Sequence, residues 1–104
     1  MADGKIKIGL IGAGGIGDHH ARAYKAMEDV ELVAVCDIVE DRARELSKRY
    51  NIPSVYTDYK ELLAKEEVDA VDICTANDTH YPITMEAIKA KKHIFCEKPL
   101  AMNY

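Results

Sequence analysis

The stretch Lys5–Gly17, KIKIGLIGAGGIG, decides the fold of this chain. It begins with a short apolar run rich in isoleucine, which is typical of a buried strand. The run passes directly into the pattern G-x-G-x-x-G, formed by Gly12, Gly14 and Gly17, and apolar residues then recur at helical spacing. Strand, glycine turn and helix in this order are the context in which the pattern predicts a site for the pyrophosphate of a dinucleotide.

Each glycine of the turn is expected to have its own task. Gly12 allows a tight turn, Gly14 lets the backbone approach a pyrophosphate, and Gly17 lets the helix pack closely against the strand. Gly15 and Ile16 begin the helix, whose free N–H groups and positive dipole end point at the phosphates. These five residues are therefore candidate cofactor contacts.

An acidic residue ends the second apolar strand, Glu31–Asp37. Asp37 stands twenty residues beyond Gly17, where a carboxylate can accept hydrogen bonds from the ribose hydroxyls of the adenosine. Asp37 and the neighbouring Ile38 are candidate cofactor contacts. The charge of Asp37 would repel a 2′-phosphate and Ile38 offers no cation, so NAD is expected rather than NADP. Arg42, on the following helix, is the residue that could reverse this preference. The alternative interpretation is a glycine-rich turn in some other α/β domain, with an incidental aspartate.

Length and composition restrict the class of protein. The chain has 104 residues, of which 48% are hydrophobic, and a formal charge of −4. This is enough for one domain, residues 1–104, with a real core. No basic stripe is present, so nucleic acid is not an expected partner. No apolar run is long enough for a membrane span, and the first residues lack a signal-peptide pattern. A cytoplasmic location is expected.

Three cysteines, an odd number without paired spacing, suit a reducing compartment. Cys36, Cys74 and Cys96 fall near the ends of predicted strands, where a metal site is conceivable because strand ends can converge. Buried structural thiols are the favoured interpretation, and no metal site is predicted. His19 and His20 are adjacent, so one helix face cannot point both at one metal. His20 is expected to pack or to hydrogen-bond near the turn, and His19 to be solvated.

Strands and helices are expected to alternate along the chain. The expected strands cover residues 6–11, 31–37, 54–56, 68–75 and 93–97, and the expected helices cover 15–28, 40–50, 58–63 and 77–91. This alternation predicts a doubly wound parallel α/β sheet of about five strands in the order 3-2-1-4-5, with right-handed crossovers and helices on both faces. Asp72 is the odd feature, a carboxylate within an apolar strand. Whether it faces a helix end or a polar partner is left open.

Glu97-Lys98-Pro99 is the most specific local motif. With it stand IGAGGIGDHHARAY, ELVAVCD, VYTDYKELL, VDAVDICTANDTHYPITMEAIKAKKHIF and CEKPLAMN, which together cover essentially the whole chain. On these residues the chain resembles the N-terminal Rossmann domain of the Gfo/Idh/MocA family of glucose–fructose oxidoreductases and inositol dehydrogenases. The resemblance implies an oxidoreductase that transfers hydride between a nicotinamide cofactor and a secondary alcohol of a sugar, cyclitol or similar polyol. It also implies a homo-oligomeric parent protein.

The resemblance further implies the positions of several site residues. Lys98 would lie beside the nicotinamide and the reacting hydroxyl, where it positions the substrate or eases proton transfer. The residues implied to line or flank the cofactor cleft are Thr75, Ala76, Asn77, His80 and Glu97. Two positions depart from the family pattern. Ala76 replaces a common proline, and Lys91 replaces a helix-ending glycine, which predicts a left-handed backbone at Lys91.

Members of this family continue into a second α/β domain that carries further catalytic residues. The chain is therefore expected to be a fragment that binds the cofactor but is inactive by itself. Two other functions remain open. One is a non-catalytic module that senses dinucleotide or acts as a scaffold. The other is an NAD-assisted glycosidase of the same family, in which the sugar is oxidised only transiently.

Overall fold

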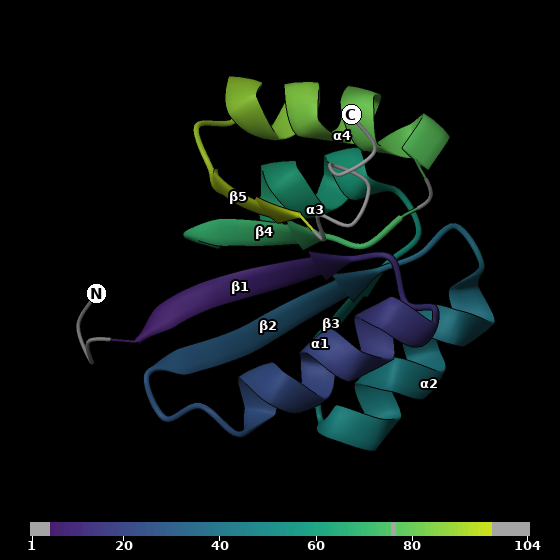
Figure 1. Cartoon of the computed structure of the whole chain (residues 1–104), viewed down its shortest axis with the longest axis vertical. Helices are drawn as coiled ribbons and strands as arrows, with labels where there is room; N and C mark the ends of the chain where they lie inside the picture. The colour runs from purple at the N-terminus through teal and green to yellow at the C-terminus, as the bar shows by residue number, and fades with distance from the viewer. Residues whose placement is uncertain (1–4, 76, 97–104) are drawn as a thin grey trace, which may run out of the picture.

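Strands and helices alternate throughout the part of the chain that the structure describes (Figure 1). A computed structural model describes residues 5–75 and 77–96, with the backbone alone for 77–81, 95 and 96. The elements are β1 Ile6–Ile11, α1 Gly15–Lys25, β2 Val30–Cys36, α2 Glu40–Tyr50, β3 Ser54–Tyr56, α3 Tyr59–Lys65, β4 Ala70–Ile73, α4 Asn77–Lys89 and β5 His93–Cys96. The expected order of elements is therefore confirmed.

The strands form one parallel sheet in the order β3-β2-β1-β4-β5, as predicted. Helices α1 and α2 cover one face, and α3 and α4 cover the other (Figure 1). β1 lies in the middle, between β2 and β4. The sheet is thus doubly wound, and the carboxyl ends of β1, β2 and β4 meet at the edge where such folds bind ligands.

Alternation along the strands divides the core between the two faces. Ile8 and Leu10 of β1 pack with Ala21 of α1 and Leu46 of α2. On the other face, Ile11, Val33, Val71 and Ile73 pack with residues of α3 and α4. Strands buried on both faces must be apolar almost throughout, which explains why their sequences read as continuous hydrophobic runs.

The ends of several elements differ from the expected ones because hydrogen bonding, rather than apolar pattern, ends them. β4 is shorter than the run 68–75, since its pairing with β1 covers only Ala70–Ile73. α4 ends in a Schellman motif: the Lys91 N–H donates to the Ile88 carbonyl, and the Lys92 N–H to the Ala87 carbonyl. Lys91 has a φ of 61°, so the predicted left-handed backbone is confirmed. Among the described residues, no helix is both long and apolar enough to cross a membrane.

Candidate functional site

The glycine turn lies between three strand ends and is closed on the side that faces the protein. The Gly12 N–H donates to the Cys36 carbonyl at 2.7 Å, and the Cys74 N–H donates to the Ile11 carbonyl at 2.7 Å. Gly12 has a φ of +108°, which L side chains rarely adopt. A methyl group there would also lie 2.8 Å from the carbonyl carbon and oxygen of Cys74. Only glycine fits this position.

The other glycines of the turn differ in what surrounds them. A methyl group on Gly17 would lie 2.1 Å from the Gly12 carbonyl oxygen, so the absence of a side chain lets α1 pack against the turn. At Gly14 and Gly15, a methyl group would meet nothing within 4 Å. The turn is therefore tight beneath Gly12 and Gly17 and open above Gly14 and Gly15, where another molecule could approach the backbone.

The open side of the turn is also the positive end of helix α1. The first backbone bond of the helix runs from the Asp18 N–H to the Gly14 carbonyl at 2.9 Å, so the N–H groups of residues 15–17 precede the helical ladder. Gly14 is the N-cap and has no side chain that could accept from them. Ile16 is half exposed at the same end. Free N–H groups and the helix dipole make this a position for an anion.

Asp37 connects the end of β2 to the glycine turn. Its carboxylate accepts hydrogen bonds from the Ala13 N–H and the Val39 N–H, each at 2.8 Å. A carboxylate offers about four acceptor positions, so about two remain for another donor. The next residue, Ile38, is 88% exposed, so its large apolar side chain projects into solvent.

A cleft of about 230 Å³ lies directly beside the turn. Its lining consists of Ala13, Gly14, Gly15, Asp18, Arg42, Glu45, Leu46 and Arg49. The Asp18 carboxylate accepts from Arg49 at 2.7 Å and from the Tyr50 hydroxyl at 2.9 Å. These hydrogen bonds, that of Tyr50 first, lower the pKa of Asp18. The negative charge of Asp18 is thus compensated by Arg49. Arg42, in contrast, forms no ion pair with any described residue.

The segment after β4 reaches the other side of the turn. The backbone nitrogen of Thr75 would lie 3.1 Å from a methyl group on Gly12. The Thr75 hydroxyl is buried and has no hydrogen-bond partner among the described residues, and a buried group of this kind commonly marks a missing partner. Asn77 begins α4 and His80 lies in its first turn, with only their backbone described. Ala76, Glu97 and Lys98 lie outside the described residues.

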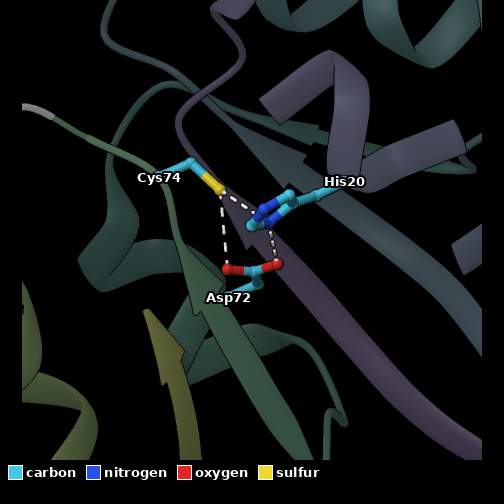
Figure 2. Close-up of side chains that lie close together, drawn as sticks. All are labelled: His20, Asp72 and Cys74. Atoms are coloured by element: carbon cyan, nitrogen blue, oxygen red, sulfur yellow. Dashed lines mark hydrogen bonds and ion pairs between the residues drawn. The ribbon is translucent and has the colours of Figure 1, made fainter. Parts of the chain in front are cut away.

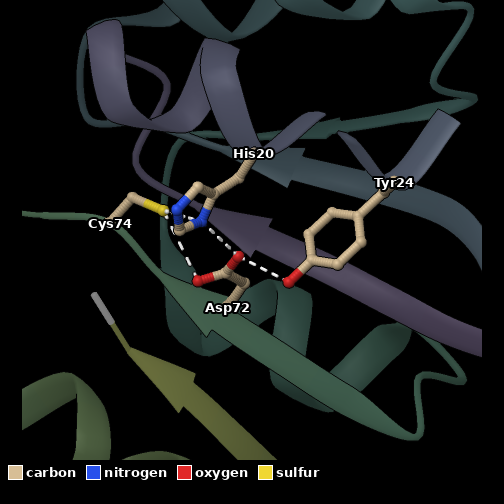
Figure 3. Close-up of polar contacts among 4 residues, drawn as sticks. All are labelled: His20, Tyr24, Asp72 and Cys74. Atoms are coloured by element: carbon tan, nitrogen blue, oxygen red, sulfur yellow. Dashed lines mark hydrogen bonds and ion pairs between the residues drawn. The ribbon is translucent and has the colours of Figure 1, made fainter. Parts of the chain in front are cut away.

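Behind the turn, Asp72 is the centre of a polar cluster (Figures 2 and 3). Its carboxylate lies 2.6 Å from His20 Nδ1, 2.6 Å from the Tyr24 hydroxyl and 3.5 Å from Cys74 Sγ. Asp72 therefore faces polar side chains rather than a helix end. His20 hydrogen-bonds, as expected, and His19 is exposed. Burial and the hydrogen bond to Asp72 raise the pKa of Tyr24.

Sequence reasoning missed two parts of this arrangement. One is the ion pair between Asp18 and Arg49, whose side chains come from different helices and stand 31 residues apart. The other is the position of Cys74 within 3.4 Å of His20 Nδ1. Neither pair follows a motif spacing. The apolar context of Asp72 was the only available signal, because a buried carboxylate needs partners.

Known proteins of one family are similar to this chain. A family model described as "Oxidoreductase family, NAD-binding Rossmann fold" matches residues 6–104. Myo-inositol 2-dehydrogenase of Thermotoga maritima is 43% identical over 98 residues, which are 94% of this chain and 29% of that protein. D-glucoside 3-dehydrogenase of Escherichia coli is 39% identical over 104 residues, which are 99% of this chain and 30% of that protein.

Among solved structures, myo-inositol dehydrogenase from Lactobacillus casei in complex with NAD(H) and myo-inositol superposes with a TM-score of 0.87 at 32% identity. The match covers 92% of this chain and 29% of that one. This chain thus spans 29–30% of the length of the relatives described here. It belongs to the Gfo/Idh/MocA family of oxidoreductases and corresponds to the NAD-binding Rossmann domain of that family.

Proposed function

We propose that this chain forms the dinucleotide-binding part of an NAD-dependent oxidoreductase that acts on a polyol. The glycine turn is the observation that carries the proposal. It is closed beneath Gly12 and Gly17, yet its backbone is open at Gly14 and Gly15, at the positive end of α1. A surface of bare backbone N–H groups suits a pyrophosphate, whose oxygens accept hydrogen bonds and carry negative charge.

The residues present fit a dinucleotide at three further points. Arg42, which forms no ion pair with a described residue, supplies a cation to the cleft beside the turn. Asp37 has acceptor capacity for two ribose hydroxyls, because in the described part of the chain its carboxylate accepts from two backbone N–H groups. Thr75, whose hydroxyl has no hydrogen-bond partner among the described residues, lies on the opposite side of the turn. When bound, the nicotinamide would supply the hydride acceptor, while these residues hold and orient the cofactor.

NAD rather than NADP is the proposed cofactor. A 2′-phosphate next to Asp37 would place like charges together, which costs about 1 kcal/mol per charge pair at 4 Å in water and more in a drier site. Among the described residues that line the cleft, Arg42 is the cation outside any ion pair, and it could offset this repulsion. It lines the cleft beside Gly14, so it is placed to serve the pyrophosphate instead. The cofactor choice therefore depends on which phosphate Arg42 contacts.

The substrate proposal is drawn from the family. The Lactobacillus casei enzyme was solved with NAD(H) and myo-inositol. By the same resemblance we assign Lys98 a role at the reacting hydroxyl. Thr75, Ala76, Asn77, His80 and Glu97 are assigned to the walls of the cofactor cleft. We further propose a homo-oligomeric, cytoplasmic parent without nucleic-acid or membrane partners. Net reduction of NAD by a polyol would separate this function from an NAD-assisted glycosidase or a non-catalytic dinucleotide-sensing module.

The valine substitution Gly14→Val tests the pyrophosphate site. The added side chain would project into open space, so the protein should stay folded, with only the modest loss of stability that valine causes at an N-cap. It would stand where phosphate oxygens must reach the backbone, so NAD binding, measured by calorimetry, should be lost. Gly14→Ala should give an intermediate affinity. If Gly14→Val binds NAD as tightly as the unchanged protein, the pyrophosphate lies elsewhere.

A second titration tests the cofactor choice. NAD and NADP are compared at one salt concentration for the unchanged protein, Asp37→Asn and Arg42→Ala. We expect tighter NAD binding in the unchanged protein and a smaller preference in Asp37→Asn, which retains a side-chain acceptor. Arg42→Ala should weaken both cofactors if the guanidinium serves the pyrophosphate. Equal or tighter binding of NADP by the unchanged protein would contradict the proposal.

A further inference from the structure

A nitrogen, a carboxylate and a sulfur meet on the side of the sheet that faces α1. His20 projects from α1 toward Asp72 of β4 and toward Cys74, which directly follows that strand (Figure 2). One ligand atom from each of these residues lies within 4.8 Å of the others. No other group of three such side chains occurs in the described parts of the chain. The cluster is independent of the residues assigned to the cofactor.

The distances in this cluster resemble the edges of a metal coordination polyhedron. Tetrahedral zinc bonds of about 2.3 Å to sulfur and about 2.0–2.1 Å to nitrogen or oxygen place sulfur about 3.5 Å from either atom. Cys74 Sγ lies 3.4 Å from His20 Nδ1 and 3.5 Å from Asp72 Oδ1. The contact of 2.6 Å between Nδ1 and Oδ2 is that of a hydrogen bond. Because Oδ1 is the carboxylate oxygen near the sulfur, Oδ1 would be the ligand, and the Nδ1–Oδ2 hydrogen bond would be replaced by the bond from Nδ1 to the ion.

Charge also favours a cation at this place. Asp72 is 1% exposed, and a buried carboxylate needs a compensating positive charge or proton. Its partners are an imidazole, a phenol and a thiol, of which only the imidazole can become cationic. A divalent ion bound by the Asp72 carboxylate, the Cys74 thiolate and a neutral His20 would give a site of zero net charge. Such a site is suited to an interior of low polarity.

Tyr24 is not one of the three ligands, but it orients one of them, Asp72. Its hydroxyl donates to Asp72 Oδ2 at 2.6 Å (Figure 3). This bond holds the carboxylate plane and leaves Oδ1, the oxygen on the sulfur side, for another partner. Hydrogen bonds of this kind orient ligating carboxylates in metal sites. The His20 side chain is 22% exposed, so an ion has a route to the cluster from solvent.

From these observations we infer that His20, Asp72 and Cys74 form a binding site for Zn²⁺, with a fourth position for water. Nitrogen, oxygen and sulfur donors together match zinc better than magnesium or calcium, which prefer oxygen alone. Binding releases the Cys74 proton as the thiolate bonds the ion, and His20 Nδ1 gives up the proton that it donates to Asp72 in the absence of the ion, so that its lone pair can bond the metal. The ion would tie α1 to the end of β4, directly beneath the glycine turn. This departs from the expectation of no metal site, which favoured buried structural thiols at the strand ends.

The test uses untagged, reduced protein that has been stripped with a chelator and then titrated with Co²⁺ as a spectroscopic substitute for Zn²⁺. We expect thiolate-to-cobalt charge-transfer absorption that saturates at about one equivalent and is reversed by Zn²⁺. X-ray absorption of the zinc-loaded protein should show one sulfur ligand. Tyr24→Phe should weaken the affinity by about tenfold or more, because the three ligands remain but lose their orienting bond.

Matched pairs of variants locate the site. Cys74→Ser and His20→Gln should abolish the cobalt absorption, whereas Cys36→Ser and the exposed His19→Gln should retain it. Circular dichroism checks that each variant is folded. The unchanged protein decides the question even if a variant fails to fold. Absence of the absorption, absence of sulfur around zinc, or absorption that survives in folded Cys74→Ser would each overturn the inference.

Discussion

Gly17→Ala is expected to destabilise the fold strongly, although alanine is the better helix former. The added methyl carbon would lie 2.1 Å from the Gly12 carbonyl oxygen. A normal contact needs about 3.5 Å, so α1 and the turn would have to separate by about 1 Å or more. Overpacking of this kind typically costs about 1–3 kcal/mol, and a rigid backbone neighbour places it at the upper end. The higher helix propensity of alanine offsets up to about 1 kcal/mol of this cost. The net loss is therefore about 2 kcal/mol or more.

Gly15→Ala is the matched control, because it makes the same change in the same helix where nothing lies within 4 Å. Urea unfolding followed by circular dichroism should show Gly15→Ala equal to or slightly more stable than the unchanged protein. In thermal unfolding, the Tm of Gly17→Ala should be about 8–16 °C below that of the unchanged protein, because each kcal/mol shifts the Tm of a domain of this size by about 4–8 °C. If the two variants differ by less than about 0.5 kcal/mol, the close approach of helix and turn does not constrain this position.

Three further predictions concern the surface and the thiols. Lys91→Gly should stabilise the fold by about 0.5–1 kcal/mol in urea unfolding, since glycine adopts the left-handed φ of 61° without strain; a loss of stability would contradict this. The hydrogen bonds of Asp18 lower its pKa from the ordinary 3.8, so ionised Asp18 stabilises the folded protein. This stabilisation is complete above pH 3.8 and is lost as the pH falls below 3.8. Arg49→Gln should accordingly flatten the acid side of the stability curve, and an unchanged curve would count against the ion pair. Burial raises the pKa of Cys36 to about 12, so iodoacetamide at pH 8 should label it only in urea; rapid labelling of the folded protein would refute its burial.

The sequence by itself was sufficient for the architecture. Apolar runs of strand length alternate with helical patterns, and right-handed crossovers leave few ways to order the strands. The glycines could be interpreted individually because their tasks are local: a positive φ at Gly12 and a close approach at Gly17 both follow from the turn itself. The left-handed end of α4 at Lys91 was predictable for the same reason, since helix termination involves only neighbouring residues.

Only the tertiary structure decided which distant side chains meet. Asp72 contacts His20 across 52 residues, and Asp18 contacts Arg49 across 31. Both contacts depend on how α1 lies on the sheet and beside α2. The packing of buried apolar side chains determines that placement, and their pattern in sequence specifies a face but not a partner. The elements and the turn are therefore readable from local pattern, whereas the polar cluster behind the turn exists only once the two segments have packed together.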